Sequence, residues 1–303
     1  MVVPFIKRKQ SIVFTRRIKK KQWKRLGVTR MAVHCVPRGV VGVDAETRSK
    51  ISARYKRITK AVNNEFWKST SETDHSFYVG SYGRGTATAD SDLDILLSLP
   101  RDEYERYDGY SSNGQSRLLQ AVKDAVLVTY PNSNIRGDGQ VVIVDFSDGM
   151  KFELLPAFER VNDWGEADGY DYPDTHRNGR WLATHPKKEQ VAMKEKNKSS
   201  NGLLFDTCKH IRNLHVERCS SYKLSGIVVD SFVFTAIGGW YWNDGDCDGS
   251  PVGSYESSLL EEYNNMTSNG LVTLFLRSPG AQQAVDARGS YECLGKILRY
   301  MAE

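Results

Sequence analysis

Two aspartates, Asp92 and Asp94, lie two positions apart at the start of an apolar run whose sequence is DLDILL. Alternate side chains of a β-strand point to the same face, so these carboxylates project together while the apolar residues face the other way. A second apolar run ends in Gly80 and Ser81, with ten residues between Ser81 and Asp92. Paired carboxylates beside a Gly-Ser turn can hold a divalent metal against a triphosphate, which predicts nucleotidyl transfer.

The carboxylate pair also indicates which cofactor the chain would use. Two anionic groups held side by side repel each other, and a proton or a cation relieves that repulsion. Magnesium prefers oxygen ligands and usually keeps waters and substrate phosphates in its coordination shell. We therefore expect Mg²⁺ or Mn²⁺ at Asp92 and Asp94, with a third carboxylate that aligns the attacking hydroxyl.

Glu153 is the best candidate for the third carboxylate. Two apolar runs, 141–146 and 150–156, flank a Ser-Asp-Gly sequence and predict a β-hairpin with a glycine turn. Glu153 stands between two apolar residues of the second run, so it points away from the face that they bury. Asp145 is the rival, although it lies near the turn, where aspartate is common for structural reasons. Taken singly, each acid also suits an exposed turn or strand position, and their combination favours a metal site.

Together these motifs resemble those of the nucleotidyltransferases built on DNA polymerase β-like folds. In that superfamily a Gly-Ser turn and a short spacer precede an Asp-hydrophobic-Asp strand, and a later strand carries a further acid. The fuller runs 80–87 (GSYGRGTA) and 91–94 (SDLD) are similar to one branch, the bacterial cGAS/DncV-like nucleotidyltransferases (CD-NTases), whose catalytic domain is often called SMODS. Segments 152–158, 172–174 and 225–232 fit the same branch, and the resemblance extends to near the C-terminus.

The first forty residues have no counterpart in this branch, and two further departures concern single motifs. Glu153 stands where many relatives have Asp, which keeps the charge but lengthens the reach. A helix that often carries Arg-x-Trp-Lys in relatives has the sequence RNLH at 212–215. Both departures concern the details of the nucleotide contacts and not the class of enzyme.

The resemblance implies an α/β (α+β) fold, with a polymerase β-like core on a mixed sheet and a mostly helical C-terminal lobe. The expected divisions are a flexible basic N-terminal arm at 1–43, a catalytic lobe at 44–186 and the helical lobe at 187–303. By the same resemblance, the acceptor is a second nucleotide and a second transfer closes a cyclic di- or trinucleotide. Relatives of this kind make second messengers in anti-phage defence. The implied partners are NTP substrates, ATP among them, and a regulatory protein.

The spacing of apolar residues predicts the elements of each lobe. Helices are expected, in chain order, at 45–66, 114–128, 187–197, 201–216 and 228–240, with a final helix that ends near Met301. A loop is expected at 101–110, because this stretch is polar and aromatic. A long ordered loop is expected at 163–186, because that stretch is rich in Gly, Asp, Asn and Pro.

The Gly-Ser turn is expected to hold the nucleotide triphosphate. Gly80 and Ser81 lead the turn, and the Ser81 hydroxyl with a following backbone N–H is the predicted phosphate contact. Gly83 and Gly85 would let the backbone approach a phosphate closely. Arg84 either reaches a phosphate or points into solvent.

A second set of nucleotide contacts is expected from the helical lobe. Lys209 and Arg212 lie three residues apart on one helical face. The resemblance implies that a basic residue of this helix contacts the β- and γ-phosphates. Ser225 begins a Ser-Gly turn before the next helix and is a further candidate.

Two other functions stay open on the residues alone. One is a template-independent RNA 3′-end nucleotidyltransferase, in which the basic arm would hold the RNA. The other is a non-catalytic nucleotide or RNA sensor. The intact trio of Asp92, Asp94 and Glu153 argues against the sensor.

Composition bounds the class and the compartment. A chain of 303 residues can form one large or two small domains. No apolar run approaches the length of a membrane span, and the N-terminus lacks the apolar stretch of a secretory signal. Five scattered cysteines without a Cys-x-x-Cys pair argue against a zinc ribbon and a disulfide framework. We therefore expect a cytoplasmic protein with no membrane span.

Charge is distributed unevenly along the chain. Residues 1–43 contain 12 Lys and Arg and no acid, which leaves 30 basic and 37 acidic residues in the remainder. Such an arm would bind nucleic acid or an anionic membrane surface through phosphates. The alternatives are a solvated tail, or upstream sequence that precedes a true start at Met31.

Overall fold

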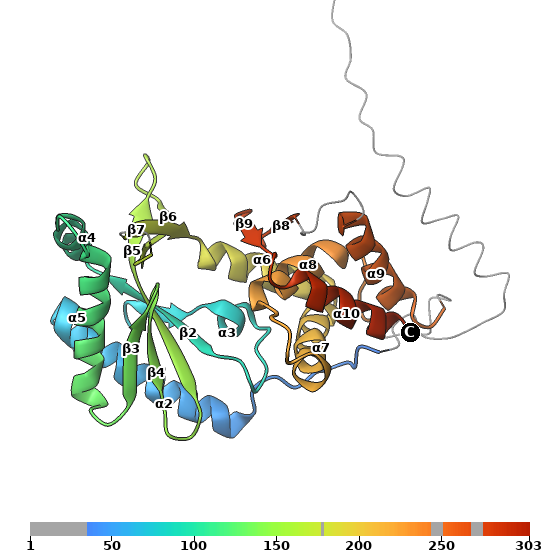
Figure 1. Ribbon diagram of the computed structural model, residues 1–303, viewed down its shortest axis with the longest axis horizontal. Coiled ribbons are helices and arrows are strands. Elements are labelled where there is room, and N and C mark those ends of the chain that lie inside the picture. The colour runs from blue at the N-terminus through green and yellow to red at the C-terminus, as the bar shows by residue number, and fades with distance from the viewer. Residues whose placement is uncertain (1–34, 177–178, 244–250, 268–274) are drawn as a thin grey trace, which may run out of the picture.

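The computed structural model describes residues 35–176, 179–243, 251–267 and 275–303. Figure 1 shows two lobes, one built on the larger sheet and one made mostly of helices. Helix α6 (Pro186–Ser199) runs from the first lobe into the second, and the short helix α3 (Gly80–Arg84) lies between them (Figure 1). This is the expected fold class, a mixed sheet with flanking helices followed by a helical lobe.

Within the described ranges, seven strands form one mixed sheet in the order β1-β2-β5-β4-β3, with β6 and β7 continuing from β5. The strands are β1 (Ser76–Tyr78), β2 (Leu93–Leu99), β3 (Asn134–Asp138), β4 (Val141–Asp145), β5 (Lys151–Val161), β6 (Ala167–Asp174) and β7 (Arg180–Thr184). Strands β2 and β5 are parallel, and the other pairs are antiparallel. The predicted hairpin is confirmed as β4 and β5, which Gly149 connects in a left-handed conformation (φ +86).

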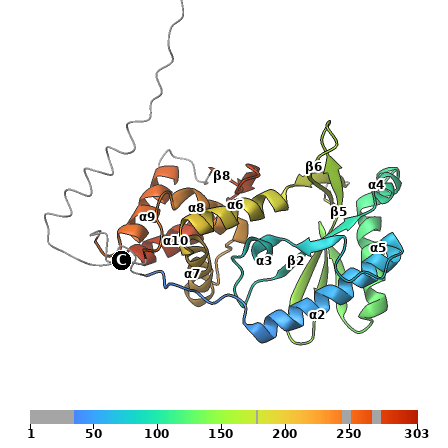
Figure 2. The ribbon, with the colours of Figure 1, turned by 180° about the vertical axis from the view of Figure 1, so that it is seen from behind.

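Three helices pack on one face of this sheet, and Figure 2 shows α2 running across it. They are α2 (Ala45–Val62), α4 (Arg101–Asp108) and α5 (Gly114–Thr129), and a short π-helical turn, η1 (Asn63–Trp67), follows α2. Asp44 caps α2 by accepting a hydrogen bond from the Thr47 backbone N–H. The predicted helices at 45–66 and 114–128 are confirmed, because their apolar stripes form this core with alternate residues of β2, β4 and β5.

The helical lobe surrounds a second core, centred on α8 (Gly226–Ala236). Its other helices are α7 (Leu203–Arg218), α9 (Ser254–Thr267) and α10 (Tyr291–Ala302), and β8 (Phe275–Arg277) pairs with β9 (Ala284–Asp286). Phe232, Tyr255 and Leu294 are fully buried in this core. No helix in the described part of the chain is long and apolar enough to cross a membrane.

The expected loop at 101–110 is wrong, because residues Arg101–Asp108 form α4. The helix is short and strongly polar, and Tyr104 and Tyr107 are its only large apolar side chains. Tyr107 is buried, and Tyr104 packs edge-on against Phe158 of β5. Contact between these rings and the sheet stabilises the helix. The polar composition of the segment gave no apolar stripe from which a helix could be predicted.

The expected long loop at 163–186 is also wrong, because it contains β6 and β7. Strand β6 pairs with the last part of β5, and β7 pairs with β6 along its length. Gly, Asp and Pro have low intrinsic propensity for strands. Backbone hydrogen bonds to an adjacent strand can outweigh that propensity. Strand β5 extends beyond β2, and β6 pairs with this last part of β5. The extension of β5 therefore explains why residues of 163–186 form strands.

The first described residues of the basic arm pack against the helical lobe. Val36 is 4% exposed and belongs to the helical core. The backbone N–H groups of Gly39 and Val40 donate to the two carboxylate oxygens of Asp206, each at 2.9 Å. The remainder of the arm, residues 1–34, lies outside the described residues.

Candidate active site

The parallel pairing of β2 with β5 brings two of the three predicted carboxylates together. Asp94 and Glu153 are register partners on these adjacent strands. The residues on either side of each acid lie in the core beneath α2 and α5, so both carboxylates point to the opposite face. Asp92 immediately precedes β2, and its side chain is 51% exposed. The three acids therefore gather at one end of the two central strands.

Asp145, the alternative third acid, lies on the same face but is engaged elsewhere. It is at the end of β4, where it accepts hydrogen bonds from Asn134 and Arg136 of β3. The register partner of Asp145 on β5 is Lys151, whereas Glu153 is the partner of Asp94. The sheet order thus favours Glu153 as the third acid.

Gly80 lies directly against Asp94. The backbone N–H of Val79 donates to the carbonyl of Asp94 at 2.9 Å, which joins the start of α3 to β2. A Cβ atom on Gly80 would lie 1.8 Å from Oδ2 of Asp94, and the φ angle of Gly80 is +57°. Only glycine allows the Gly-Ser turn to approach the carboxylate this closely. Ser81 follows in the first turn of α3 and is partly buried.

We expect Gly80→Ala to lower the free energy of unfolding by about 2–4 kcal/mol, from left-handed backbone strain together with displacement of Asp94. Chemical denaturation would measure this loss. Gly149→Ala is the matched control, because Gly149 has a φ of +86° but a methyl group added to it would meet nothing within 4 Å. Gly149→Ala introduces the same left-handed backbone strain but no steric clash. Equal losses of unfolding free energy in Gly80→Ala and Gly149→Ala would therefore contradict the close contact of Gly80 with Asp94.

Lys151 places a positive charge inside the carboxylate cluster. Its Nζ atom lies 2.5 Å from Oε1 of Glu153 and 3.1 Å from Oδ2 of Asp92. Burial opposes the charged form of Lys151, but the hydrogen bonds to the two acids outweigh it and raise the pKa of the lysine. This residue was not among the candidates predicted from the sequence. A period of two along β5 places Lys151 on the face of Glu153, so the signal was available.

The surroundings of Asp94 oppose its charged form. Burial, and then the nearby charge of Glu153, raise the pKa of Asp94 to about 7. Two acids in such proximity resist ionising together. Any positive charge bound between them would lower that pKa again.

The donor chemistry of the cluster fits a divalent metal. In the described part of the chain, no three His, Cys, Asp or Glu side chains converge on one metal position. Instead the Lys151 ammonium stands between Asp92 and Glu153, and so marks where the cluster holds positive charge. Three carboxylates supply the oxygen ligands that Mg²⁺ and Mn²⁺ prefer.

The side chain of Arg84, the last residue of α3, lies in a buried ion-pair network. Its side chain is 8% exposed, with Nη1 3.0 Å from Glu189 of α6 and Nε 2.8 Å from Asp230 of α8. Arg212 joins the same network, because its Nη2 lies 2.7 Å from the second oxygen of Asp230 and also donates to Thr86. Arg84 therefore connects α3 to the helical lobe, and Arg212 connects α7 to Thr86, just after α3.

Asp230 is the centre of this network, although it was not among the predicted site residues. Burial alone raises the pKa of Asp230, but the guanidinium groups of Arg212 and Arg84 outweigh burial and hold it below the ordinary value. A lone aspartate inside the apolar sequence VVDSFVF was the available signal, since a buried charge needs a partner.

The two remaining candidates of the helical lobe are in different surroundings. Lys209 is partly buried on α7, with Nζ 3.3 Å from the Val40 carbonyl and beside Gly42, which packs against Ala87 of the loop that leads to β2. Lys209 therefore contacts the segment that leads to α2. Ser225 occupies the N-cap position of α8, and its backbone N–H donates to Oγ of Ser290 at 2.9 Å. Ser225 therefore takes part in packing within the helical lobe.

Gly83 and Gly85 serve packing between the lobes. A Cβ on Gly83 would lie 2.5 Å from the Tyr78 carbonyl and 2.7 Å from Nε2 of Gln190. A Cβ on Gly85 would lie 2.6 Å from the ring of Phe205. The glycines therefore let α3 approach α6 and α7 closely, which is a structural reason for the glycine-rich turn.

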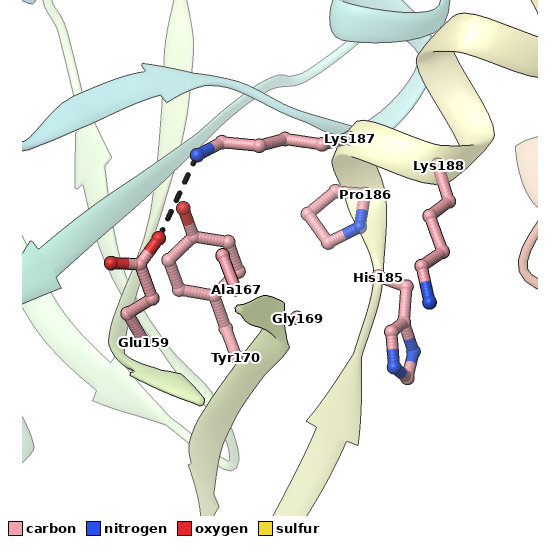
Figure 3. A pocket seen from close by; sticks show the side chains of 8 residues that line it. All are labelled: Glu159, Ala167, Gly169, Tyr170, His185, Pro186, Lys187 and Lys188. Carbon is pink, nitrogen blue, oxygen red and sulfur yellow. Dashed lines mark ion pairs between the residues drawn. The ribbon is translucent and has the colours of Figure 1, made fainter. Parts of the chain in front are cut away.

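A small pocket lies on the same sheet face, between β5, β6 and the start of α6 (Figure 3). Lys187 reaches across it, with Nζ 3.9 Å from Glu159 and over the ring of Tyr170 (Figure 3). The pocket has a volume of about 60 Å³, which is too small for a nucleotide. It is therefore not the predicted nucleotide site.

Comparison with known proteins places the fold. Among solved structures, the chain is similar to the Elizabethkingia meningoseptica CdnE cyclic dinucleotide synthase with GTP and Apcpp, at 13% identity and a TM-score of 0.59 over 93% of this chain and 96% of that one. It is also similar to the Rhodothermus marinus CdnE c-UMP-AMP synthase with Apcpp and Upnpp, at 14% identity and a TM-score of 0.56 over 93% and 94%. A third match is the E. coli MS115-1 CdnC:HORMA-deltaN complex, at 14% identity and a TM-score of 0.53 over 86% and 84%.

These likenesses show the polymerase β-like nucleotidyltransferase fold, as the sequence predicted. No curated protein matches the chain by sequence. The family model for the Second Messenger Oligonucleotide or Dinucleotide Synthetase (SMODS) domain matches residues 40–197, just over half of the chain. The chain therefore belongs to the SMODS family of cGAS/DncV-like nucleotidyltransferases.

Proposed function

We propose that this protein joins NTPs into a cyclic di- or trinucleotide with the help of bound Mg²⁺ or Mn²⁺. The observation that carries the proposal is the register of β2 and β5, which sets Asp94 beside Glu153 where Gly80 closes against the same carboxylate. Membership in a family of oligonucleotide or dinucleotide synthetase domains supports this class of product. Nucleotides in the structures of two similar synthases, GTP with Apcpp and Apcpp with Upnpp, support NTP substrates, ATP among them.

Each acid has a part in the proposed reaction. Asp92, Asp94 and Glu153 would hold the metal, which when bound neutralises triphosphate charge and lowers the pKa of the attacking hydroxyl. Glu153 would accept the hydroxyl proton as the ribose oxygen attacks the α-phosphorus. A new O–P bond forms while the bond from the α-phosphorus to the bridging oxygen breaks, and pyrophosphate leaves. A second transfer between the joined nucleotides would close the ring.

The leaving phosphates need contacts from both lobes. We assign the first to Gly80 and Ser81 at the start of α3, which lies against Asp94. We assign the second to Lys209, whose ammonium lies near Gly42, a residue that itself packs against Ala87 of the loop before β2. The buried ion pairs of Arg84 and Arg212 support a structural part for these residues instead.

A signalling role and a protein partner follow from the same family. We propose that the product is a second messenger in bacterial anti-phage signalling, and that a regulatory protein controls its synthesis. The similar E. coli structure is a complex of CdnC with HORMA-deltaN, which supports a protein partner for this fold.

The product identifies the function. Purified protein would be incubated with labelled ATP, GTP, CTP and UTP plus Mg²⁺ or Mn²⁺, without and with RNA, and the products treated with phosphatase and resolved by mass. A phosphatase-resistant small product without a free phosphate end is expected. Growth of the RNA instead would assign the chain to RNA 3′-end transfer and contradict the proposal.

A further inference from the structure

The lysine inside the carboxylate cluster is the feature that the proposed reaction does not use. Lys151 reaches two acids from different segments, Glu153 on its own strand and Asp92 before β2. Its side chain is 30% exposed, against 51% for Asp92 and 25% for Glu153. The ammonium is thus partly enclosed by the groups that would hold a metal.

The acid opposite Lys151 on the neighbouring strand is engaged by other side chains. Its register neighbour on β4 is Asp145, which is already bound by Asn134 and by Arg136 of β3. Because Arg136 already binds Asp145, Lys151 pairs with the acids of the cluster instead. The side chain is directed there by strand geometry, since residues two apart on β5 share a face.

We propose that Lys151 is an internal cation that occupies the carboxylate cluster and that a divalent metal must displace. This inference rests on the acidic site of the proposed function, and it adds how that site is regulated by its own chain. A metal ion bound by Asp92 and Glu153 would lie within a few ångströms of the ammonium, where two positive charges repel strongly. Binding of the metal and departure of the lysine are therefore coupled.

The coupling extends to the nucleotide. A displaced ammonium gains most from a new anionic partner nearby, and the triphosphate is the anion that the proposed reaction brings to this face. Lysine suits such a change because its long stem and compact charge can rotate between partners. Metal alone would then bind weakly, and metal together with a nucleotide would bind more tightly.

The test measures metal binding without any reaction. Isothermal titration calorimetry would follow Mn²⁺ binding to the full chain without nucleotide, in the wild type, Lys151→Met and Lys151→Arg. Lys151→Met keeps the aliphatic stem and removes the charge, and we expect it to bind Mn²⁺ at least about fivefold more tightly. Lys151→Arg keeps the charge and should bind like the wild type. Lys198→Met, at an exposed position of α6, controls for net charge.

A second measurement addresses the nucleotide. A non-hydrolysable ATP analogue should tighten Mn²⁺ binding to the wild type by a larger factor than to Lys151→Met, because the variant has no ammonium to relocate. Lys151→Gln provides the same comparison if the methionine variant does not fold.

The outcomes separate this inference from the proposed function. Tighter Mn²⁺ binding by Lys151→Met supports the internal cation even if no cyclic nucleotide is ever made. Equal or weaker binding by both neutral variants would overturn it, even if the wild type proves to be a cyclic oligonucleotide synthase. Absence of Mn²⁺ binding in all variants would also overturn it.

Discussion

Asp94→Asn should reduce nucleotide consumption by about 10³-fold while making the metal-free protein more stable. The loss follows because an amide removes a charged ligand from the site that must neutralise the triphosphate, a contribution of several kcal/mol. The gain in stability follows because the fold disfavours the ionised form of Asp94: burial and the charge of Glu153 raise its pKa to about 7. Opposite changes in activity and stability are typical of functional residues.

The pH dependence of that stability gain has a definite sign. An aspartate whose pKa is higher in the folded state than in the unfolded state is protonated more readily when folded. Below the unfolded pKa, about 4, both states are protonated and the variant gains nothing. The penalty in the wild type then grows between about pH 4 and pH 7, and it is complete above that range. Thermal unfolding in chelator should therefore show a larger difference between Asp94→Asn and the wild type at pH 8 than at pH 5.

Asp90→Asn is the matched control for this prediction. Asp90 lies in the loop before the acidic pair and is exposed. Its amide variant should retain activity and show no change in the unfolding midpoint. A fall in the stability of Asp94→Asn at pH 8 would show that the Asp94 carboxylate supports the fold, and would contradict its assignment to the metal site.

Asp230→Asn should lower the free energy of unfolding by about 3–5 kcal/mol. The carboxylate is fully buried and pairs with two guanidinium groups, Arg84 at 2.8 Å and Arg212 at 2.7 Å. Removing one partner of a buried ion pair leaves its counter-ions without compensation, which costs far more than the pair itself contributes. Urea denaturation followed by circular dichroism would measure the loss.

The same substitution should also reduce activity, because Arg84 is the last residue of α3 and fixes that helix to α6 and α8. Asp286→Asn is the control for this ion pair. Asp286 pairs with Arg288 at the surface, where the two side chains are 61% and 77% exposed, so Asp286→Asn should leave the free energy of unfolding almost unchanged. If the two variants lost similar stability, the network around Asp230 would not hold the lobes together.

Local sequence determined the parts of the site that depend on strand periodicity. The alternation in 92–97 and 150–156 set which side of each strand carries an acid, because a period of two leaves no other choice once the apolar residues are buried. Helices such as α2 and α5 followed from apolar stripes for the same reason. Helix α4 and the β6–β7 pair were not predicted, since their few apolar contacts are made with β5 or through the backbone.

Tertiary structure decided which charged groups meet. Asp145 and Glu153 both have the alternation of a candidate third acid, and the parallel pairing of β2 with β5 sets Glu153, not Asp145, beside Asp94. Arg84 and Arg212 have the composition of phosphate ligands, yet Asp230 of α8, which is 146 residues from Arg84, holds both in the interior. Lys151 entered the cluster because Asp92 came to it from another segment of the chain. A sequence specifies the face on which a side chain projects, whereas its partner depends on contacts between distant segments, which exist only once the chain has folded.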